Sequence, residues 1–503
     1  MSAAPLTLAP ADRPSPAFLD GGPKKLLIGG AWVPARSGGT IETVDPTTER
    51  VLTSVAAAGP EDVDLAVAAA RRAFEDPSWA GRTPYERGLL LLRIADAIEE
   101  NAGELAVLDS LDTGAPIRLS HWFVARAVEV VRHYAGWPTK IYGQTAPPRP
   151  GAFGYTLRRP LGVAVGITAG NGPLLQAARK IGPALATGNT LVLKPAGQSP
   201  LTVLRLGELL ADTGLPDGVV NILTGHGQVA GEAIVSHPGV DKISFTGSAA
   251  VGKHILRASA NTLKRVTLEL GGGKSPNIVF ADADLKAAAR GAAAGFAAGF
   301  AVSGGQGCVT GTRIFVEESV REEFARLLTG ELATYTLGDP FHPGTRMGPL
   351  ASRRHFERVT SYLDIAREEG ARLRRDGELA EGSGLFFPPV VVDDVTDDMR
   401  TAREEVFGPV AALMSFTDEA ELLRLANDTG HGLAAAVWTR DLARAHRVAD
   451  ALRAAAVWIN TYGRTSTDSD LPFGGHEQSG TGHEHGTQVL DAYTETKTVM
   501  IQT

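Results

Sequence analysis

The sequence predicts an α/β protein with two domains, and three observations lead to this prediction. From about residue 161 onward, short apolar stretches of strand length alternate with helical stretches, which is typical of parallel sheets wound with helices. The chain has 503 residues, more than one hydrophobic core normally organises. Its 43% hydrophobic and 21% charged residues match an ordinary globular protein, which excludes a fibre or a largely disordered chain.

The first third of the chain is predicted to be mostly helical. Residues 1–24 are rich in Pro and Ala, lack a signal-peptide core and are expected to form a loose arm. Residues 60–74 begin with Pro-Glu-Asp, which favours a helix start, and residues 84–108 carry apolar side chains at helical spacing. We interpret both segments as amphipathic surface helices.

Two series of alternating strands and helices follow. The first has strands at 161–168, 190–195, 219–225 and 241–247, with helices at 174–185 and 202–210 and a short helix before the last strand. The second has strands at 312–318, 387–392, 410–416, 432–439 and 455–460, with helices from 352, at 420–428 and at 442–452. We therefore expect two α/β domains that meet between residues 270 and 310. A Pro-rich segment from 146 and a tail from about 486 fit neither domain and are expected to project as arms.

Charge and cysteine content narrow the class of function. Lys and Arg total 49 against 57 Asp and Glu, so the net charge of −8 argues against nucleic acid or an acidic membrane surface and favours a small-molecule substrate. A single cysteine excludes an intrachain disulfide and a cysteine-rich zinc site, and it fits the reducing cytoplasm. No apolar run approaches the ~20 residues of a membrane-spanning helix. We expect no metal and no membrane partner.

Two glycine-rich turns follow predicted strands. One contains Gly227, and the other contains Gly247 and Ser248. Glycines at a strand-to-helix turn let backbone N–H groups approach a phosphate, so either turn could hold a dinucleotide. Neither has the full Gly-x-Gly-x-x-Gly pattern, and an ordinary turn is the alternative. Lys194, at the end of the 190–195 strand, could contact a ribose or a phosphate, or it could be a solvated charge.

Three residues have surroundings suited to carbonyl chemistry. Cys308 lies among glycines, which supply N–H groups that would lower the thiol pKa or bind an oxyanion; the alternative is a structural cysteine. Glu269 ends an apolar strand, where partial burial would raise its pKa toward that of a general base; the alternative is a salt-bridged or solvent-facing acid. Asn171 follows the 161–168 strand, and its amide would either donate to an oxyanion or form a turn.

Taken together, these segments resemble the NAD(P)-dependent aldehyde dehydrogenase superfamily over nearly the whole chain. The motifs stand in the family's order and at nearly its spacing, which makes the set specific although each motif alone is weak. They are Ile167-Thr168, Asn171-Gly172-Pro173, Lys194-Pro195, Phe245-Thr246-Gly247-Ser248, Glu269-Leu270-Gly271-Gly272, Gly305-Gln306-Gly307-Cys308, EEVFGPV at 404–410, Val457-Trp458-Ile459-Asn460 and Pro472-Phe473-Gly474-Gly475.

The resemblance implies a reaction and a set of site residues. It implies oxidation of an aldehyde to the carboxylic acid with reduction of NAD, and it leaves NADP open. It also implies that Cys308 attacks the aldehyde, that the Asn171 amide and the Cys308 N–H hold the oxyanion, and that Glu269 activates the water that hydrolyses the thioester. By the same analogy the cofactor contacts are Lys194, Gly227, Gly247, Ser248, Glu405 and Phe407.

The resemblance also implies an architecture. It places a Rossmann-type cofactor domain at 25–145 and 162–272, an α/β catalytic domain at 273–473 and a small β bridging element at 146–161 and 486–503. In the family such an element pairs subunits, so a homodimer or a homotetramer is expected.

The sequence departs from the family pattern at four places. Gly197 stands where relatives often have a ribose-binding glutamate, which keeps NADP open. Gly170 and Gly172 replace two aromatic residues beside Asn171, from which we expect a roomier tunnel for bulky, hydrophobic or aromatic aldehydes. The run 271–273 holds one extra glycine, and the helix before Cys308 is longer by about four residues, close to one turn of ~3.6 residues.

Two other functions remain open from the sequence. A coenzyme A-acylating dehydrogenase would usually lack the glutamate at 269, so Glu269 counts against it. A catalytically silent member, acting as a binding or structural protein, would have no need of Cys308, Glu269 and Asn171, although the two insertions keep this alternative open.

Overall fold

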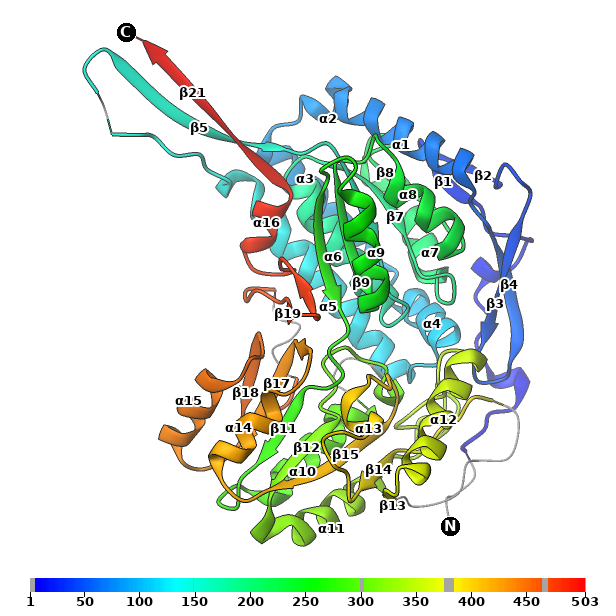
Figure 1. Ribbon diagram of the computed structural model, residues 1–503. Coiled ribbons are helices and arrows are strands. Elements are labelled where there is room, and N and C mark those ends of the chain that lie inside the picture. The colour runs from blue at the N-terminus through cyan, green and yellow to red at the C-terminus, as the bar shows by residue number, and fades with distance from the viewer. Residues whose placement is uncertain (1–4, 148, 299–302, 375–383, 464–468, 503) are drawn as a thin grey trace.

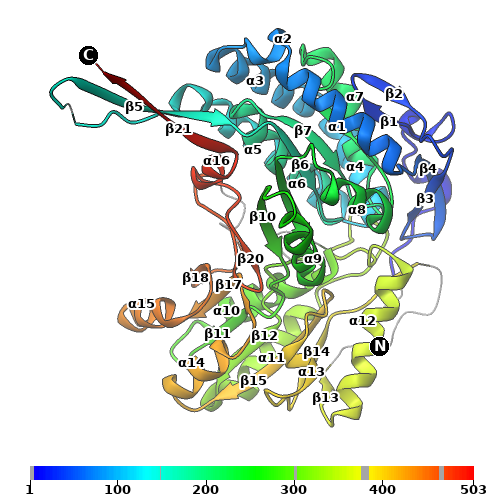
Figure 2. The same ribbon diagram turned by 45° about the horizontal axis from the view of Figure 1, so that its top comes forward.

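The computed structural model describes residues 5–147, 149–298, 303–374, 384–463 and 469–502. Over these residues the chain forms two large sheets, one in each half of the molecule, with helices on both faces of each (Figure 1). This arrangement confirms the predicted α/β fold class. The same two halves are distinct in the rotated view of Figure 2.

The first sheet has eight strands among the described residues. Five central strands are parallel and the flanking ones are antiparallel to their neighbours. Their order is β2 (Ala31–Val33), β1 (Leu26–Ile28), β8 (Val220–Ile222), β7 (Thr190–Lys194), β6 (Val163–Ile167), β9 (Lys242–Gly247), β10 (Arg265–Leu270) and β20 (Gly480–Thr481). Side chains of β7 alternate between two cores: Leu191 and Leu193 pack on one face and Val192 on the other. Apolar residues on both faces explain why this strand reads as an unbroken apolar run.

The second sheet has seven strands in the described part of the chain, and only its edge strand β13 is antiparallel to its neighbour. Their order is β13 (Arg372–Arg374), β14 (Val390–Asp393), β15 (Val410–Phe416), β12 (Arg313–Glu317), β11 (Pro276–Val279), β17 (Ala434–Trp438) and β18 (Ala456–Ile459). On β12 the side chains of Ile314 and Val316 face one core and that of Phe315 the other. This sheet is therefore also buried on both faces.

The helices fall into two groups that follow the two sheets. The helices of the first half are α1 (Pro60–Glu75), α2 (Pro77–Ala80), α3 (Pro84–Glu100), α4 (Ala102–Thr113), α5 (Ile117–Ala135), α6 (Pro173–Ala186), α7 (Leu201–Leu210), α8 (Glu232–Ser236), α9 (Ala249–Ser259) and α16 (Gln488–Ala492). Those of the second half are α10 (Leu285–Ala293), α11 (Arg321–Leu332), α12 (Arg353–Glu368), α13 (Arg400–Arg403), α14 (Glu419–Asn427) and α15 (Leu442–Ala451). Short two-stranded sheets add β3 (Thr40–Asp45) with β4 (Arg50–Ala56) and β16 (His431–Gly432) with β19 (His476–Glu477).

Two local predictions differ from the structure. The single helix expected at 84–108 is two helices, because Asn101 leaves the helical conformation (φ −105°) and its side-chain amide donates to the Ala97 carbonyl at 2.8 Å. The arm expected to be loose is held over its described residues. Arg13 pairs with Asp45 at 2.7 Å and with Asp339 at 2.9 Å, so it connects the two halves.

A long two-stranded arm projects from the first half. It consists of β5 (Ala152–Pro160) and β21 (Thr494–Gln502), which pair antiparallel along their whole length (Figure 1). Phe153, Met500 and Ile501 are exposed on it. An extended ribbon with exposed apolar side chains suits packing against another protein surface.

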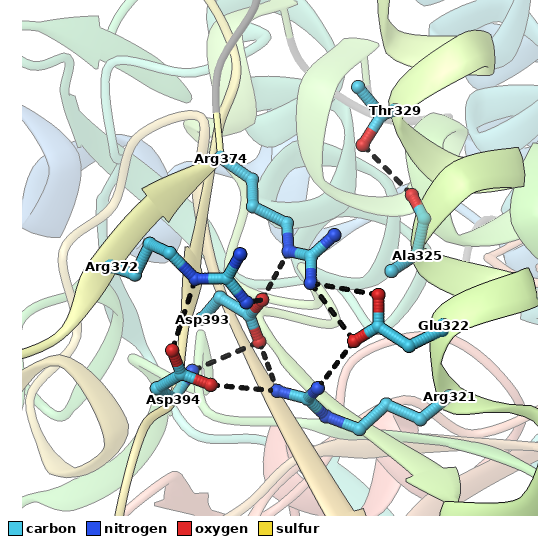
Figure 3. Close-up of polar contacts among 8 residues, drawn as sticks. All are labelled: Arg321, Glu322, Ala325, Thr329, Arg372, Arg374, Asp393 and Asp394. Atoms are coloured by element: carbon cyan, nitrogen blue, oxygen red, sulfur yellow. Dashed lines mark hydrogen bonds and ion pairs between the residues drawn. The ribbon is translucent and has the colours of Figure 1, made fainter.

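The edge of the second sheet is held by an ion-pair network (Figure 3). Asp393, which is fully buried, accepts from the guanidinium groups of Arg321, Arg372 and Arg374. Arg321 begins α11, whereas the other two arginines belong to β13. One carboxylate therefore connects an edge strand to a helix.

We expect Asp393→Asn to lower the free energy of unfolding by about 3 kcal/mol, because it removes the buried charge that three guanidinium groups share. Urea unfolding measures this. Glu322→Gln is the matched control: Glu322 pairs with Arg374 at 3.0 Å in the same network but is 69% exposed, so its loss should change stability by less than about 1 kcal/mol. Equal effects of the two substitutions would contradict the prediction.

Candidate active site

Glu269 is positioned by three strands of the first sheet. It lies one residue before the end of β10, in register with Thr246 of β9 on one side and with Gly480 of β20 on the other. The side chain is 5% exposed, and neither carboxylate oxygen makes a hydrogen bond within the described residues. Burial, reinforced by the nearby Glu484 carboxylate, raises the pKa of Glu269 well above its ordinary value. A carboxylate held in this way is a strong proton acceptor.

Cys308 and Asn171 are brought together from distant parts of the chain. Asn171 lies between β6 and α6, and its side-chain amide donates to the Gln306 carbonyl at 2.9 Å, two residues before Cys308. The Gln306 side chain accepts in turn from the Ala351 N–H at 2.9 Å. Because an amide nitrogen carries two hydrogens, Asn171 keeps a second donor beside Cys308.

The acidity of the Cys308 thiol differs from the prediction. The flanking glycines predicted a lowered pKa, but burial raises the thiol pKa to about 12. The nearby Glu405 and Glu269 carboxylates also raise it, and the Arg179 guanidinium lowers it. Cys308 as a whole residue is partly exposed, although burial makes ionisation of its thiol costly.

The run with the extra glycine is held from several sides. The N–H groups of Gly272 and Gly273 donate to Glu405 Oε1 at 3.1 and 2.9 Å, and the Ser479 hydroxyl donates to the Gly271 carbonyl at 2.9 Å. A Cβ on Gly272 would lie only 2.9 Å from the Cys308 carbonyl oxygen, so the run packs directly against the cysteine. The insertion therefore fixes Glu405 close to Cys308.

The longer segment before Cys308 begins as α10 and continues as a π-helical turn at Ala294–Ala298. A π-helical turn accommodates an additional residue within a helix. Residues 299–302, which hold the rest of the predicted extra turn, lie outside the described residues.

The residues expected to contact a cofactor lie at the carboxyl ends of β7, β8 and β9. Lys194 ends β7, is 4% exposed and contacts the Pro195 carbonyl at 3.4 Å; burial lowers its pKa to about 8. Ser248 is exposed and caps α9, and Gly247 precedes it. A Cβ on Gly227 would meet no atom within 4 Å, so the space beside it is open. A phosphate-bearing ligand fits this arrangement of an ammonium group, a helix N-terminus and a glycine with free space beside it.

Phe407 lies on the opposite half, two residues after Glu405. Its backbone has φ +61°, and its carbonyl lies 2.7 Å from Nε2 of His355 on α12. Glu405 faces the glycine run, as described above, and Phe407 lines a small cavity with Asn171. Asn171, Gln306 and Phe407 thus line one cavity, and the Glu269 and Glu405 carboxylates act electrostatically on Cys308.

That cavity has a volume of about 60 Å³ and includes Phe123, Gly170, Gly172 and Gln198 in its wall. A Cβ on Gly172 would lie 3.3 Å from the Phe123 ring, and one on Gly170 would lie 2.5 Å from Gln198 Nε2. Phe123 and Gln198 therefore occupy part of the space that two aromatic side chains would otherwise fill.

The prediction from sequence missed three charged residues next to Glu269. Lys180 of α6 is fully buried, forms an ion pair with Glu484 and donates to the Thr246 hydroxyl at 2.9 Å. Arg179 precedes it and lies near enough to lower the pKa of both Glu269 and Cys308. The available signal was two consecutive basic residues in the otherwise apolar run LLQAARKIGPALA.

The described residues contain no group of three or more His, Cys, Asp or Glu side chains that could hold a metal ion. No helix among them is long and apolar enough to cross a membrane.

Comparison with known proteins gives one consistent family. Residues 32–499 match the model of the aldehyde dehydrogenase family. The chain is 44% identical over 478 residues to an aldehyde dehydrogenase of Emericella nidulans, covering 95% of each chain. It is 44% identical over 481 residues to aldehyde dehydrogenase 1A1 of Gallus gallus, covering 95% of this chain and 93% of that one.

A solved structure agrees closely with this fold. The NAD⁺ complex of an aldehyde dehydrogenase from Bacillus cereus superposes with a TM-score of 0.94 at 44% identity, covering 99% of both chains. Neither the acylating dehydrogenase nor the catalytically silent protein is favoured by these comparisons.

Proposed function

Because the chain belongs to the aldehyde dehydrogenase family, we propose that Cys308, Asn171 and Glu269 oxidise an aldehyde to its carboxylic acid with NAD or NADP as the hydride acceptor. The observation that carries this assignment is the 2.9 Å hydrogen bond from the Asn171 amide to the Gln306 carbonyl. This bond joins the loop that carries Asn171, the proposed oxyanion donor, to the loop that carries Cys308, the proposed nucleophile. The buried carboxylate near them is that of Glu269.

Cys308 attacks the aldehyde after losing its proton. Since its pKa is about 12, little thiolate exists at neutral pH, and a neighbouring base must accept the proton as the sulfur reacts. Glu269, whose pKa is raised by burial, is such a base. The oxyanion that forms is held by the second amide hydrogen of Asn171 and by the backbone N–H of Cys308.

The cofactor contacts are assigned to residues at the carboxyl ends of the first sheet and to the loop of Glu405 and Phe407 on the opposite half. Lys194 binds the adenosine ribose, Gly227, Gly247 and Ser248 line the phosphates, and Glu405 with Phe407 positions the nicotinamide ribose. When bound, the nicotinamide accepts the hydride that leaves the tetrahedral carbon. Gly197 leaves open space where an acidic side chain would repel a 2′-phosphate, since a Cβ there would meet only the Gly225 carbonyl at 3.8 Å. NAD is the proposed cofactor, and NADP is the alternative.

Release of the acid requires water. Glu269 first releases the thiol proton to solvent and then takes a proton from that water, which attacks the thioester carbonyl and frees the Cys308 thiolate. The buried Lys180–Glu484 ion pair lies beside Glu269 and fixes its electrostatic surroundings, with Glu484 raising the carboxyl pKa and Lys180 lowering it.

The substrate is proposed to be bulky, with a hydrophobic or aromatic body. Gly170 and Gly172 remove two large side chains beside Asn171, and Phe123 and Phe407 line the adjoining cavity. Aromatic walls suit an aromatic aldehyde better than acetaldehyde.

We also propose a cytoplasmic homodimer or homotetramer. The β5–β21 arm, with its exposed Phe153, Met500 and Ile501, offers the contact surface between subunits, and the single cysteine fits a reducing compartment.

The test is the increase in absorbance at 340 nm with a panel of aldehydes and each cofactor. We expect kcat/KM for aromatic aldehydes to be at least about tenfold higher than for acetaldehyde. The reason is that an aromatic ring makes more apolar contact with the cavity than a methyl group does. Cys308→Ala is the negative control. A clear preference for acetaldehyde would contradict the substrate assignment, and no signal with any aldehyde and either cofactor would contradict the activity.

A further inference from the structure

Arg179 carries a charge that no described residue balances. Its neighbour Lys180 is buried and paired with Glu484, whereas Arg179 is partly exposed and lies with its guanidinium carbon 5.9 Å from the centre of the Phe473 ring. Nε of Arg179 is buried and has no hydrogen-bond partner among the described residues. Buried guanidinium N–H groups are almost always bonded, so this position calls for an acceptor that the described residues do not supply.

His485 lies next to the same phenylalanine. Its ring is 6.4 Å from that of Phe473 in an edge-on arrangement, and the residue is 2% exposed. Neither ring nitrogen has a hydrogen-bond partner in the described part of the chain. The backbone at His485 has φ +59°, in the left-handed region that costs a non-glycine residue free energy. Two polar side chains with unused nitrogen atoms thus border one aromatic ring.

This place adjoins the proposed base. The backbones of Phe473 and Glu484 bond to each other at 2.7 and 2.6 Å, and the Glu484 carboxylate pairs with Lys180. Lys180 in turn donates to the hydroxyl of Thr246, which is in register with Glu269. The Arg179 charge lowers the pKa of both Cys308 and Glu269, which places the guanidinium within electrostatic reach of the reacting atoms.

The charges around His485 are mostly positive. Burial, followed by the cations of Arg179, Arg126, His133 and Lys180, keeps the pKa of His485 well below its ordinary value. Its imidazole is therefore neutral and offers one N–H donor. A neutral donor beside a guanidinium, in a positive surrounding, suits an anion.

We propose that Arg179 and His485 bind a carboxylate carried by the aldehyde substrate, at the end of the molecule away from the reacting carbonyl. This inference rests on the proposed function and narrows its substrate class to aldehydes that bear an anionic group. The guanidinium fork binds a carboxylate through two parallel hydrogen bonds, and the Phe473 ring packs against the body of the substrate. An aromatic aldehyde with a ring carboxylate, such as 4-formylbenzoate, has every feature that this arrangement recognises.

The first test compares 4-formylbenzoate with its neutral methyl ester. The wild-type enzyme should show a kcat/KM about 30-fold higher for the carboxylate, because only the carboxylate pairs with Arg179. Arg179→Gln should abolish this preference by raising KM for the carboxylate alone, whereas the loss of its charge near Cys308 and Glu269 should change kcat for both aldehydes by the same factor. Arg179→Lys should keep part of the preference, since it retains the charge but not the fork.

Arg447→Gln is the matched control, because Arg447 lies on α15 and is 56% exposed; the preference should be unchanged in this variant. If Arg179→Gln lowers kcat/KM for both aldehydes equally, Arg179 acts only on the acidity of Cys308 and the proposal is overturned. A wild-type enzyme with no preference for the carboxylate would overturn it as well.

The second test needs no turnover. Isothermal titration should show benzoate binding at least about tenfold more tightly than benzamide to the wild-type protein, and this difference should vanish in Arg179→Gln. Benzoate binding that is equal in the two proteins overturns the carboxylate subsite even if aldehydes are oxidised. Arg179-dependent binding of benzoate without oxidation of any aldehyde supports the subsite and contradicts the proposed function.

Discussion

Cys308→Ala is expected to lower kcat/KM by at least about 10⁴-fold, because the chain has no second thiol to form the covalent bond to the aldehyde. The same substitution should abolish alkylation by iodoacetamide, since Cys308 is the single cysteine of the chain. Stopped-flow absorbance at 340 nm and mass spectrometry measure the two effects.

The pH dependence of alkylation checks the state of the thiol. With a pKa of about 12, the thiolate fraction of the wild-type protein rises about tenfold for each pH unit between pH 7 and 10, and the alkylation rate should rise with it. A rate that levels off below pH 8 would show a much more acidic thiol and would contradict the effect of burial. Unchanged thermal unfolding of Cys308→Ala is the control that its loss of activity is chemical.

Glu269→Gln is expected to lower kcat by about 10²- to 10³-fold and to slow the burst of reduced cofactor, because both the thiol of Cys308 and the water that hydrolyses the thioester lose their base. In the wild-type enzyme the raised pKa means that the carboxyl is protonated at low pH, so kcat should increase as pH rises through that pKa. In the glutamine variant this increase should disappear. Rapid-mixing experiments across pH separate the burst from the steady state.

The unfolding temperature of Glu269→Gln serves as the control for its loss of activity. The buried Glu269 carboxyl has no hydrogen bond to lose in the described structure, so the neutral amide should not lower the unfolding temperature. Glu208→Gln, on α7 and paired with Arg205 at 2.8 Å, changes the same atoms at an exposed position and should leave kcat unchanged. A full steady-state rate in Glu269→Gln would assign the base to another group.

The sheets could be predicted from the sequence, and the three central site residues could be proposed from it, because both signals are local. Strands buried on both faces appear as short apolar runs, as at β6, β7 and β9, and the motifs around Asn171, Glu269 and Cys308 are contiguous. The prediction of one helix at 84–108 was wrong because apolar spacing continues across Asn101, where the chain turns.

The surroundings of the site could not be predicted because they depend on contacts across the fold. Lys180 meets Glu484 from a segment 304 residues away, and only the fold determines that Arg179 faces Phe473 instead of that ion pair. The raised pKa of Cys308 has the same origin: glycines next to it in sequence suggested an exposed thiol, but residues from both halves bury it. The residues next to Cys308 in the sequence determine the local backbone conformation, whereas the burial of its thiol depends on the fold of the whole chain.

The pairing of β20 with β10 has a consequence for how the protein is made. Gly480 lies opposite Glu269, so the sheet that carries the proposed base gains its last strand only after the whole second half has been synthesised. On the ribosome the first sheet emerges early, but its edge beside Glu269 stays unpaired until residue 481 has left the exit tunnel. A nascent chain therefore carries Cys308, the proposed nucleophile, without a complete site around it while residues 309–481 are still being made.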